Sequence, residues 1–293
     1  MKFIFSVLLL SLNAFAFAQY NRALYDSELK MKLWFDSLYH RNEVRYLLPD
    51  EKKQAYGDSI SKEFSQILHI EGAFYFPFDS LTKVGKIISD DSLVRILTYN
   101  IRLKGGKYKY YGFILKRKNI QDEEVKVFEL IDKSDSLPIK ELENLTLNSN
   151  QWYGASYYQI ATYRDRKQTN YVLIGWDGFS AYVNRKVVEI LFFNKKGKPT
   201  FGKNVFQSDQ KTVRRLIFNH SIKATMSCRY DSILNAVVFD HLVPSSNIYQ
   251  GMYEFYGPNG TYDGYFLKKS LWIFKEDLEP KNPRKKNELP SKN

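Results

Sequence analysis

The chain has 293 residues, with 44 basic against 32 acidic residues, a formal net charge of +12 and a single cysteine, Cys228. This length allows one large domain or two small ones, each with a sizeable hydrophobic core. A lone cysteine excludes an internal disulfide and any zinc site built from several cysteines, so the core must hold the fold together.

The N-terminus has the residue order of a secretory signal peptide. Lys2 supplies a positive charge, residues 3–12 are almost all apolar, and Ala16 and Ala18 are the small residues of a cleavage site. The apolar run is shorter than the roughly 20 residues of a transmembrane helix. We expect export to the periplasm or beyond, with a mature chain that begins at Gln19 and carries neither a lipid anchor nor a transmembrane segment.

Residues 20–70 are predicted to form an amphipathic helical hairpin, broken near Pro49. In the first helix, leucines at spacings of four and five predict a buried face made of Leu24, Leu29, Leu33 and Leu38. In the second, helical spacing predicts a buried face made of Ile60, Phe64, Ile67 and Leu68. The hairpin either covers one face or end of a sheet or offers a docking surface to a partner.

From about residue 87 the apolar period changes from near 3.6 to 2, which indicates strands. Gly105-Gly106 predicts a hairpin turn, because both central positions of such a turn need a positive φ. A second hairpin is expected to turn near residues 165–169. The last strands are expected on either side of a turn at residues 258–260.

The clearest alternation lies at residues 224–230. It predicts a strand with one face in the core and the other in water. The core face is Ala224, Met226, Cys228 and Tyr230, and the water face is Thr225, Ser227 and Arg229. Cys228 is then a small buried apolar residue rather than a nucleophile.

Short polar turns between the strands favour antiparallel neighbours over βαβ units. The predicted fold is mainly β, an antiparallel meander with a sandwich, barrel or propeller-like form, preceded by the N-terminal helical hairpin. The predicted organisation is a signal peptide (1–18), a helical segment (19–86), an antiparallel β-domain (87–279) and a basic tail (280–293). The tail is rich in proline and lysine, so we expect it to be disordered and to make at most a weak contact with an anionic surface.

Trp176-Asp177-Gly178 is the first candidate site, at the end of an apolar run. Asp-Gly favours a chain reversal because both residues tolerate a positive φ, so a corner is expected there. The functional alternative stacks Trp176 on a sugar ring while Asp177 accepts its hydroxyl groups, with Asp263 converging from another loop.

Asp240-His241 is the only place where a carboxylate and an imidazole adjoin. Neighbours on a strand face opposite sides, so these two cannot bond to each other, but each can pair with a distant residue. The histidine spacings match no metal motif, and no cofactor motif is present, so we predict neither a metal nor a cofactor.

Three segments, "NYVLIGWDGFSAYVNRKVVEILFF", "CRYDSILNAVVFDHLVP" and "YEFYGPNGTYDGYFLKKSLWIF", resemble a family of uncharacterised secreted bacterial proteins over residues 157–278. The resemblance implies export and a β-rich C-terminal half. It brings no known activity.

Two classes of function stay open, and nucleic-acid binding fits neither, since export is expected and no recognition motif is present. The first is a non-catalytic exported protein that binds a glycan or an envelope protein. The second is an exported, glycan-directed hydrolase whose carboxylates converge from separate loops. No motif fixes a catalytic residue, which favours the first class. The candidate binding residues are Trp176, Asp177, Asp263, Asp240 and His241.

Overall fold

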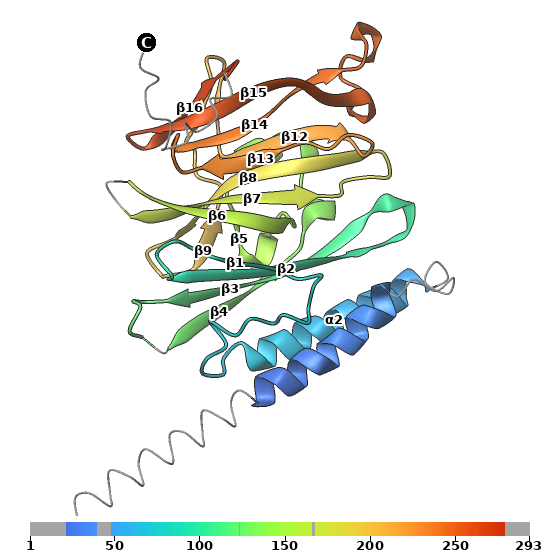
Figure 1. Cartoon of the computed structure of the whole chain (residues 1–293), viewed down its shortest axis with the longest axis vertical. Helices are drawn as coiled ribbons and strands as arrows, with labels where there is room; N and C mark the ends of the chain where they lie inside the picture. Colours follow the sequence, from blue (N-terminus) through green and yellow to red (C-terminus); the bar gives the residue numbers. More distant parts are fainter. Residues whose placement is uncertain (1–21, 40–47, 123, 166–167, 279–293) are drawn as a thin grey trace, which may run out of the picture.

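The structure is a computed structural model that describes residues 22–39, 48–122, 124–165 and 168–278. A helical layer and three β-sheets are stacked on one another (Figure 1). The predicted signal peptide and basic tail lie outside the described residues. In the part of the chain that is described, no helix is long and apolar enough to cross a membrane.

The helical layer consists of a helix over residues 22–39 and α2 (Asp50–Ile67). The first sheet has the order β1-β2-β3-β4, with β1 (Gly85–Ile88), β2 (Val94–Arg102), β3 (Tyr108–Arg117) and β4 (Val125–Ile131). Short 3₁₀ helices connect the strands throughout the chain: η2 (Lys104–Gly106), η3 (Ser134–Ser136), η4 (Ile139–Asn144), η5 (Ser149–Gln151), η6 (Asn247–Tyr249) and η7 (Tyr253–Phe255).

The second sheet has the order β5-β9-β8-β7-β6, and β12 also pairs with β8. Its strands are β5 (Leu147–Asn148), β6 (Ser156–Arg164), β7 (Thr169–Asp177), β8 (Val183–Phe193), β9 (Pro199–Phe201) and β12 (Arg215–Ser221). The third sheet has the order β11-β10-β16-β15-β14-β13. Its strands are β10 (Phe206–Gln207), β11 (Thr212–Val213), β13 (Cys228–Asp231), β14 (Ala236–Pro244), β15 (Tyr256–Lys268) and β16 (Leu271–Lys275).

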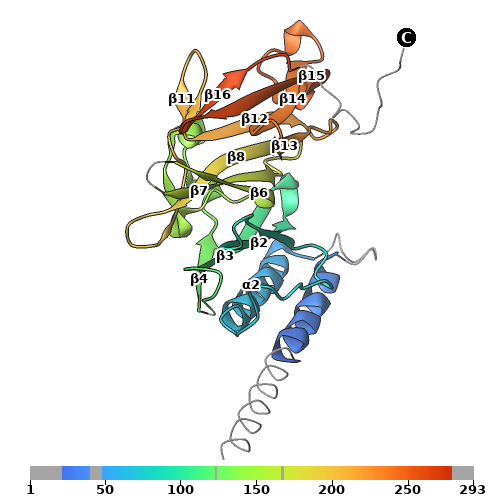
Figure 2. The ribbon, with the colours of Figure 1, turned by 60° about the vertical axis from the view of Figure 1, so that its left-hand side comes forward.

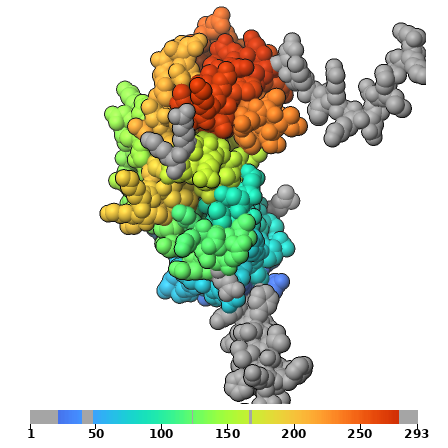
Figure 3. All heavy atoms as spheres, turned by 90° about the vertical axis from the view of Figure 1, so that its left-hand side faces the viewer, coloured from blue at the N-terminus to red at the C-terminus, as the bar shows by residue number. Residues whose placement is uncertain are grey.

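The prediction of a mainly β, antiparallel fold preceded by helices is confirmed. Among the described strands, the neighbours in each sheet run antiparallel except for β10 and β16, which are parallel. The stacked sheets correspond to the sandwich alternative of that prediction (Figure 2). The helices lie toward one end of the molecule, and β15 and β16 lie toward the other (Figure 3).

The first sheet is buried on both faces. Alternate residues of β2 enter different hydrophobic clusters: Leu97 and Tyr99 pack with Phe64 of α2, whereas Val94 and Ile96 pack against the second sheet. The helical hairpin therefore covers one face of this sheet, which is the first of the two roles expected for it.

The second sheet is likewise buried on both faces. Tyr171 and Leu173 of β7 join the cluster shared with the first sheet, and Val172 and Ile174 join the cluster shared with the third sheet. Strands covered on both sides read as continuous apolar runs, which explains why β7 and β8 lack a polar/apolar alternation.

The predicted buried face of the first helix is wrong in two of its four positions. Leu29 and Leu33 are 58% and 67% exposed. A spacing of five residues rotates about 140° beyond a full turn, so these leucines leave the face on which Leu24 lies. The buried face instead comprises Leu24, Met31, Phe35 and Leu38. The face predicted for α2 is confirmed at all four positions.

Of the turn predictions, the hairpin at Gly105-Gly106 is confirmed, with φ angles of 69° and 76°, but its connection is longer than a two-residue turn and contains η2. The prediction of a turn at residues 258–260 is wrong, because these residues lie within the single strand β15. Asp240 pairs with Tyr262 while Leu242 pairs with Pro258, so β15 carries extra residues at this point and bulges. Gly260, with a φ of 95°, lies in the bulge rather than in a hairpin turn.

The predicted alternation of burial over residues 224–230 is confirmed, but the predicted strand is shorter than expected, because β13 begins only at Cys228. Met226 and Cys228 are buried and Ala224 and Tyr230 are half-buried, whereas the three alternate residues are exposed. The register places Cys228 opposite Phe239 of β14.

The helix face can be tested with two alanine variants. Met31→Ala removes a side chain with no exposed surface and should lower the free energy of unfolding by about 2–5 kcal/mol, because the site cannot fully collapse. Leu33→Ala, on the outer face, should change it by less than about 0.5 kcal/mol. Urea denaturation measures both, and an equal loss in the two variants would contradict this orientation of the helix.

The strand register can be tested through the thiol of Cys228. Burial raises the pKa of Cys228 to about 12, so thiolate is scarce near neutral pH and the sulfur is also shielded. We expect a thiol reagent to label the native protein very slowly and the urea-unfolded protein at the rate of a free thiol. Rapid native labelling would contradict the register.

Candidate functional site

Asp177 is the last residue of β7 and lies directly opposite Arg185 of β8. The predicted corner is confirmed in its position, since the chain reverses over residues 178–182 directly after Asp177, but neither Asp177 nor Gly178 has the expected positive φ. The need for glycine at position 178 comes from packing and not from a positive φ. A Cβ there would lie 2.3 Å from the ring atom Cε2 of Tyr108, so only glycine lets β3 approach.

Two buried tyrosines hold the Asp177 carboxylate. The Tyr110 hydroxyl donates to Oδ1 at 3.0 Å, and the Tyr153 hydroxyl donates to Oδ2 at 2.6 Å. Tyr110 in turn accepts the backbone N–H of Gly178 at 2.8 Å. Both carboxylate oxygens are thus used within the protein.

Arg185 is fixed beside the same carboxylate. Its Nε donates to Asn219 Oδ1 at 2.7 Å and its Nη1 donates to the Tyr153 hydroxyl at 3.0 Å. Nη1 lies 3.9 Å from Asp177 Oδ2, and the guanidinium carbon lies 3.2 Å from the ring centroid of Phe179. Nη2 makes no hydrogen bond within the described residues and is not sealed from solvent.

Electrostatics keep these groups in defined protonation states. Burial raises the pKa of Asp177, while the hydrogen bond from Tyr153, the charge of Arg185 and the hydrogen bond from Tyr110 oppose that shift. Burial also raises the pKa of Tyr110 and of Tyr153, so both phenols stay protonated and can donate. The directions of the hydrogen bonds fit an ionised Asp177 between two neutral phenols.

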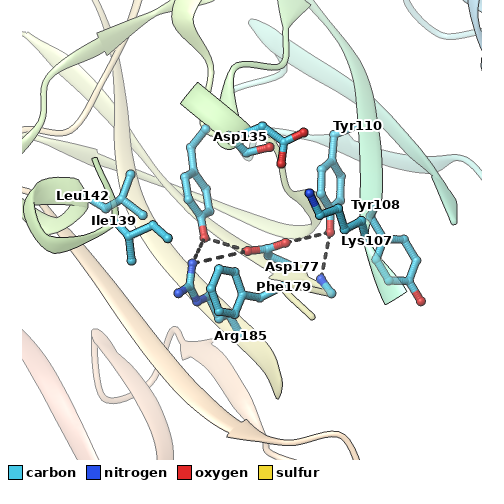
Figure 4. Close-up of a pocket in the computed structure, with 12 residues that line it drawn as sticks. Lys107, Tyr108, Tyr110, Asp135, Ile139, Leu142, Asp177, Phe179 and Arg185 are labelled. Atoms are coloured by element: carbon cyan, nitrogen blue, oxygen red, sulfur yellow. Dashed lines mark hydrogen bonds and ion pairs between the residues drawn. The ribbon is translucent and has the colours of Figure 1, made fainter. Parts of the chain in front are cut away.

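This cluster forms the wall of a cavity of about 330 Å³ at the end of the first and second sheets (Figure 4). Such a volume lies at the lower end of the range for small-molecule sites. The apolar wall comes from Tyr108, Ile139, Leu142 and Phe179. Lys107 and Asp135, both exposed, add one charge of each sign at the rim, and neither side chain has an ion pair among the described residues.

The other predicted site residues lie elsewhere. Trp176 stands outside the lining, with its ring 5.1 Å from that of Tyr108 and at 85° to it. Asp263 and His241 meet on the third sheet, where Nδ1 of His241 lies 2.7 Å from Asp263 Oδ2. Asp240 accepts the backbone N–H of Ser227 at 2.7 Å. The structure therefore joins His241 to Asp263 but brings only Asp177 to the cavity.

Within the described ranges, no group of three or more His, Cys, Asp or Glu residues is placed to hold a metal ion. No protein-family model, no curated protein and no solved structure matches the chain. The resemblance of residues 157–278 to secreted bacterial proteins therefore stays a prediction.

Most of the cavity could not be predicted from the sequence, although β8 carried one signal of it. Arg185 and Glu189 occupy the same alternate positions as the apolar Val187 and Leu191, all of which are buried. Charged residues in register with a buried apolar face indicate internal ion pairs. Nothing in the sequence distinguishes Tyr108, Tyr110 and Tyr153, which also line the cavity, from the rest of the 22 tyrosines of the chain.

The role of Asp177 can be tested with Asp177→Asn. The amide supplies one acceptor where two phenols donate, and it leaves the buried Arg185 without its carboxylate. We expect a loss of roughly 3 kcal/mol in the free energy of unfolding, the scale of breaking a buried pair. Asp135→Asn, at the exposed rim of the same cavity, should change it by less than about 0.5 kcal/mol. Equal stability of both variants would show that the buried carboxylate does not organise this site.

Proposed function

We propose that this chain is an exported, non-catalytic binding protein that takes a small ligand, a glycan fragment or another envelope component, in the cavity at the end of β7 and β8. The residue order at positions 1–18 supports export. The cavity is concave, with an apolar wall and a few converging polar groups, which is the usual composition of a ligand site.

One observation carries the proposal. Arg185 is 95% buried, yet one of its two terminal nitrogens makes no hydrogen bond within the described part of the chain. This nitrogen is not sealed from solvent, so it can exchange a water molecule for an acceptor group of a ligand. A cavity-lining arginine with a spare donor is therefore suited to an external acceptor.

The hydrolase alternative is less well supported. Asp135 and Asp177 both line the cavity, so two carboxylates do converge there. Both oxygens of Asp177, however, accept hydrogen bonds from Tyr110 and Tyr153, and an acid catalyst needs an oxygen free to give its proton to the substrate. Asp177 is better placed to hold Arg185 than to react.

Binding can be tested by saturation-transfer NMR with a mixture of soluble cell-envelope glycan fragments. We expect transfer to a subset of fragments with the wild-type protein and its loss, at least tenfold in affinity, with Phe179→Ala, because that ring forms part of the cavity wall. Tyr253→Ala is the control, since Tyr253 is a similarly exposed aromatic residue of η7, far along the chain from the cavity.

Equal transfer with all three proteins would place binding outside the cavity, and no transfer at all would contradict the proposed function. The same spectra test the alternative. New anomeric signals that grow with time in the wild type and are absent with Asp135→Asn would favour the hydrolase.

A further inference from the structure

We infer that the ligand of this cavity is an acidic sugar, a pyranose ring bearing one carboxylate, which is bound by Arg185 and Lys107. The inference rests on the proposed function and adds the chemical class of the ligand.

The anion is indicated by the donors that the protein leaves unused. Nη2 of Arg185 and the ammonium of Lys107 both belong to the cavity lining, and neither has a partner within the described residues. A planar guanidinium matches a carboxylate, and a lysine ammonium acts as a second point charge. Asp177 balances the charge of Arg185 within the protein but lies 3.9 Å from Nη1, and it leaves Nη2 without a hydrogen-bond acceptor in the part of the chain that the structure describes.

The ring is indicated by the aromatic wall. Tyr108 lines the cavity from β3, and Phe179 lines it from the connection between β7 and β8. Tyr108 is half-buried and Phe179 is exposed, so both rings have accessible surface. The C–H face of a pyranose is apolar and packs on aromatic rings by area burial. Phe179 already lies against the guanidinium of Arg185, so a ring beside it would bring its carboxylate to that arginine.

A sugar rather than an aromatic acid is indicated by the rim. Asp135 is exposed at the mouth of the cavity, and its carboxylate makes no hydrogen bond or ion pair within the described chain. A carboxylate is a strong acceptor for hydroxyl groups. An aromatic acid would place only carbon atoms there and would leave that acceptor unused. The Ser134 hydroxyl already donates to Asp132 at 2.7 Å, so it can serve a ligand only as an acceptor.

The test uses isothermal titration calorimetry with the intact mature protein and three probes: galacturonate, its neutral amide galacturonamide, and phenylacetate. We expect galacturonate to bind at least about tenfold more tightly than its amide, since hydrogen bonds to a charged group exceed neutral ones. Phenylacetate should bind more weakly than galacturonate. Comparing galacturonate with its amide measures the contribution of the carboxylate charge to affinity. Comparing galacturonate with phenylacetate measures the preference for a sugar ring over an aromatic ring.

Two lysine variants locate the contact. Lys107→Gln should weaken galacturonate about fivefold or more and leave the amide unchanged, because it removes a charge at the cavity without touching the buried network. Lys104→Gln is the matched control, since Lys104 lies in the same turn but outside the lining of this cavity. Both side chains are exposed, so folding should be unaffected.

The outcomes separate this inference from the proposed function. Equal affinity for acid and amide overturns the acidic class, and tighter binding of phenylacetate overturns the sugar, but in both cases ligand binding by the cavity stands. If none of the three probes binds, the inference is overturned, and the proposed function is then decided by the Phe179→Ala comparison. Equal effects of the two lysine variants would also overturn the assignment.

Discussion

The whole structure depends on the burial of β8 between two layers. A strand covered on both faces has no water for its polar side chains, so each charged group must find its partner inside the protein. Arg185 and Glu189 stand on the same face of β8, four residues apart. Each is paired directly across the sheet, Arg185 with Asp177 of β7 and Glu189 with Arg215 of β12.

The two ion pairs belong to one buried polar network between the first and second sheets. The Tyr157 hydroxyl donates to Glu189 and accepts the indole N–H of Trp152 at 2.9 Å. Tyr153 connects the two ion pairs. Its hydroxyl bonds to Asp177 and Arg185, and its ring centroid lies 5.7 Å from the guanidinium carbon of Arg215. Such a network fixes the stacking of the two sheets, since a slip would leave buried charges unpaired.

The sequence could predict what depends on local periodicity, and it could not predict what depends on layering. The register around Cys228 followed from strict alternation on a half-exposed strand. On β7 and β8 burial of both faces removes that alternation, so Asp177 could be interpreted only from its sequence neighbours Trp176 and Gly178. The cavity brings together β3, residues 134–142 and the end of β7, which only the stacking of sheets places side by side.

The two ion pairs differ in how many guanidinium nitrogens of the arginine have a partner within the described protein. Arg215 contacts Glu189 through Nε and Nη2 and donates from Nη1 to the carbonyl of Leu142, with no exposed surface. Arg185 uses only Nε and Nη1, and Phe179 covers one face of its guanidinium. The remaining donor is therefore held in a fixed position before any ligand arrives. A donor that is already immobilised loses little conformational entropy on binding, so in the proposed function the fixed position of Arg185 would favour both affinity and a defined ligand orientation.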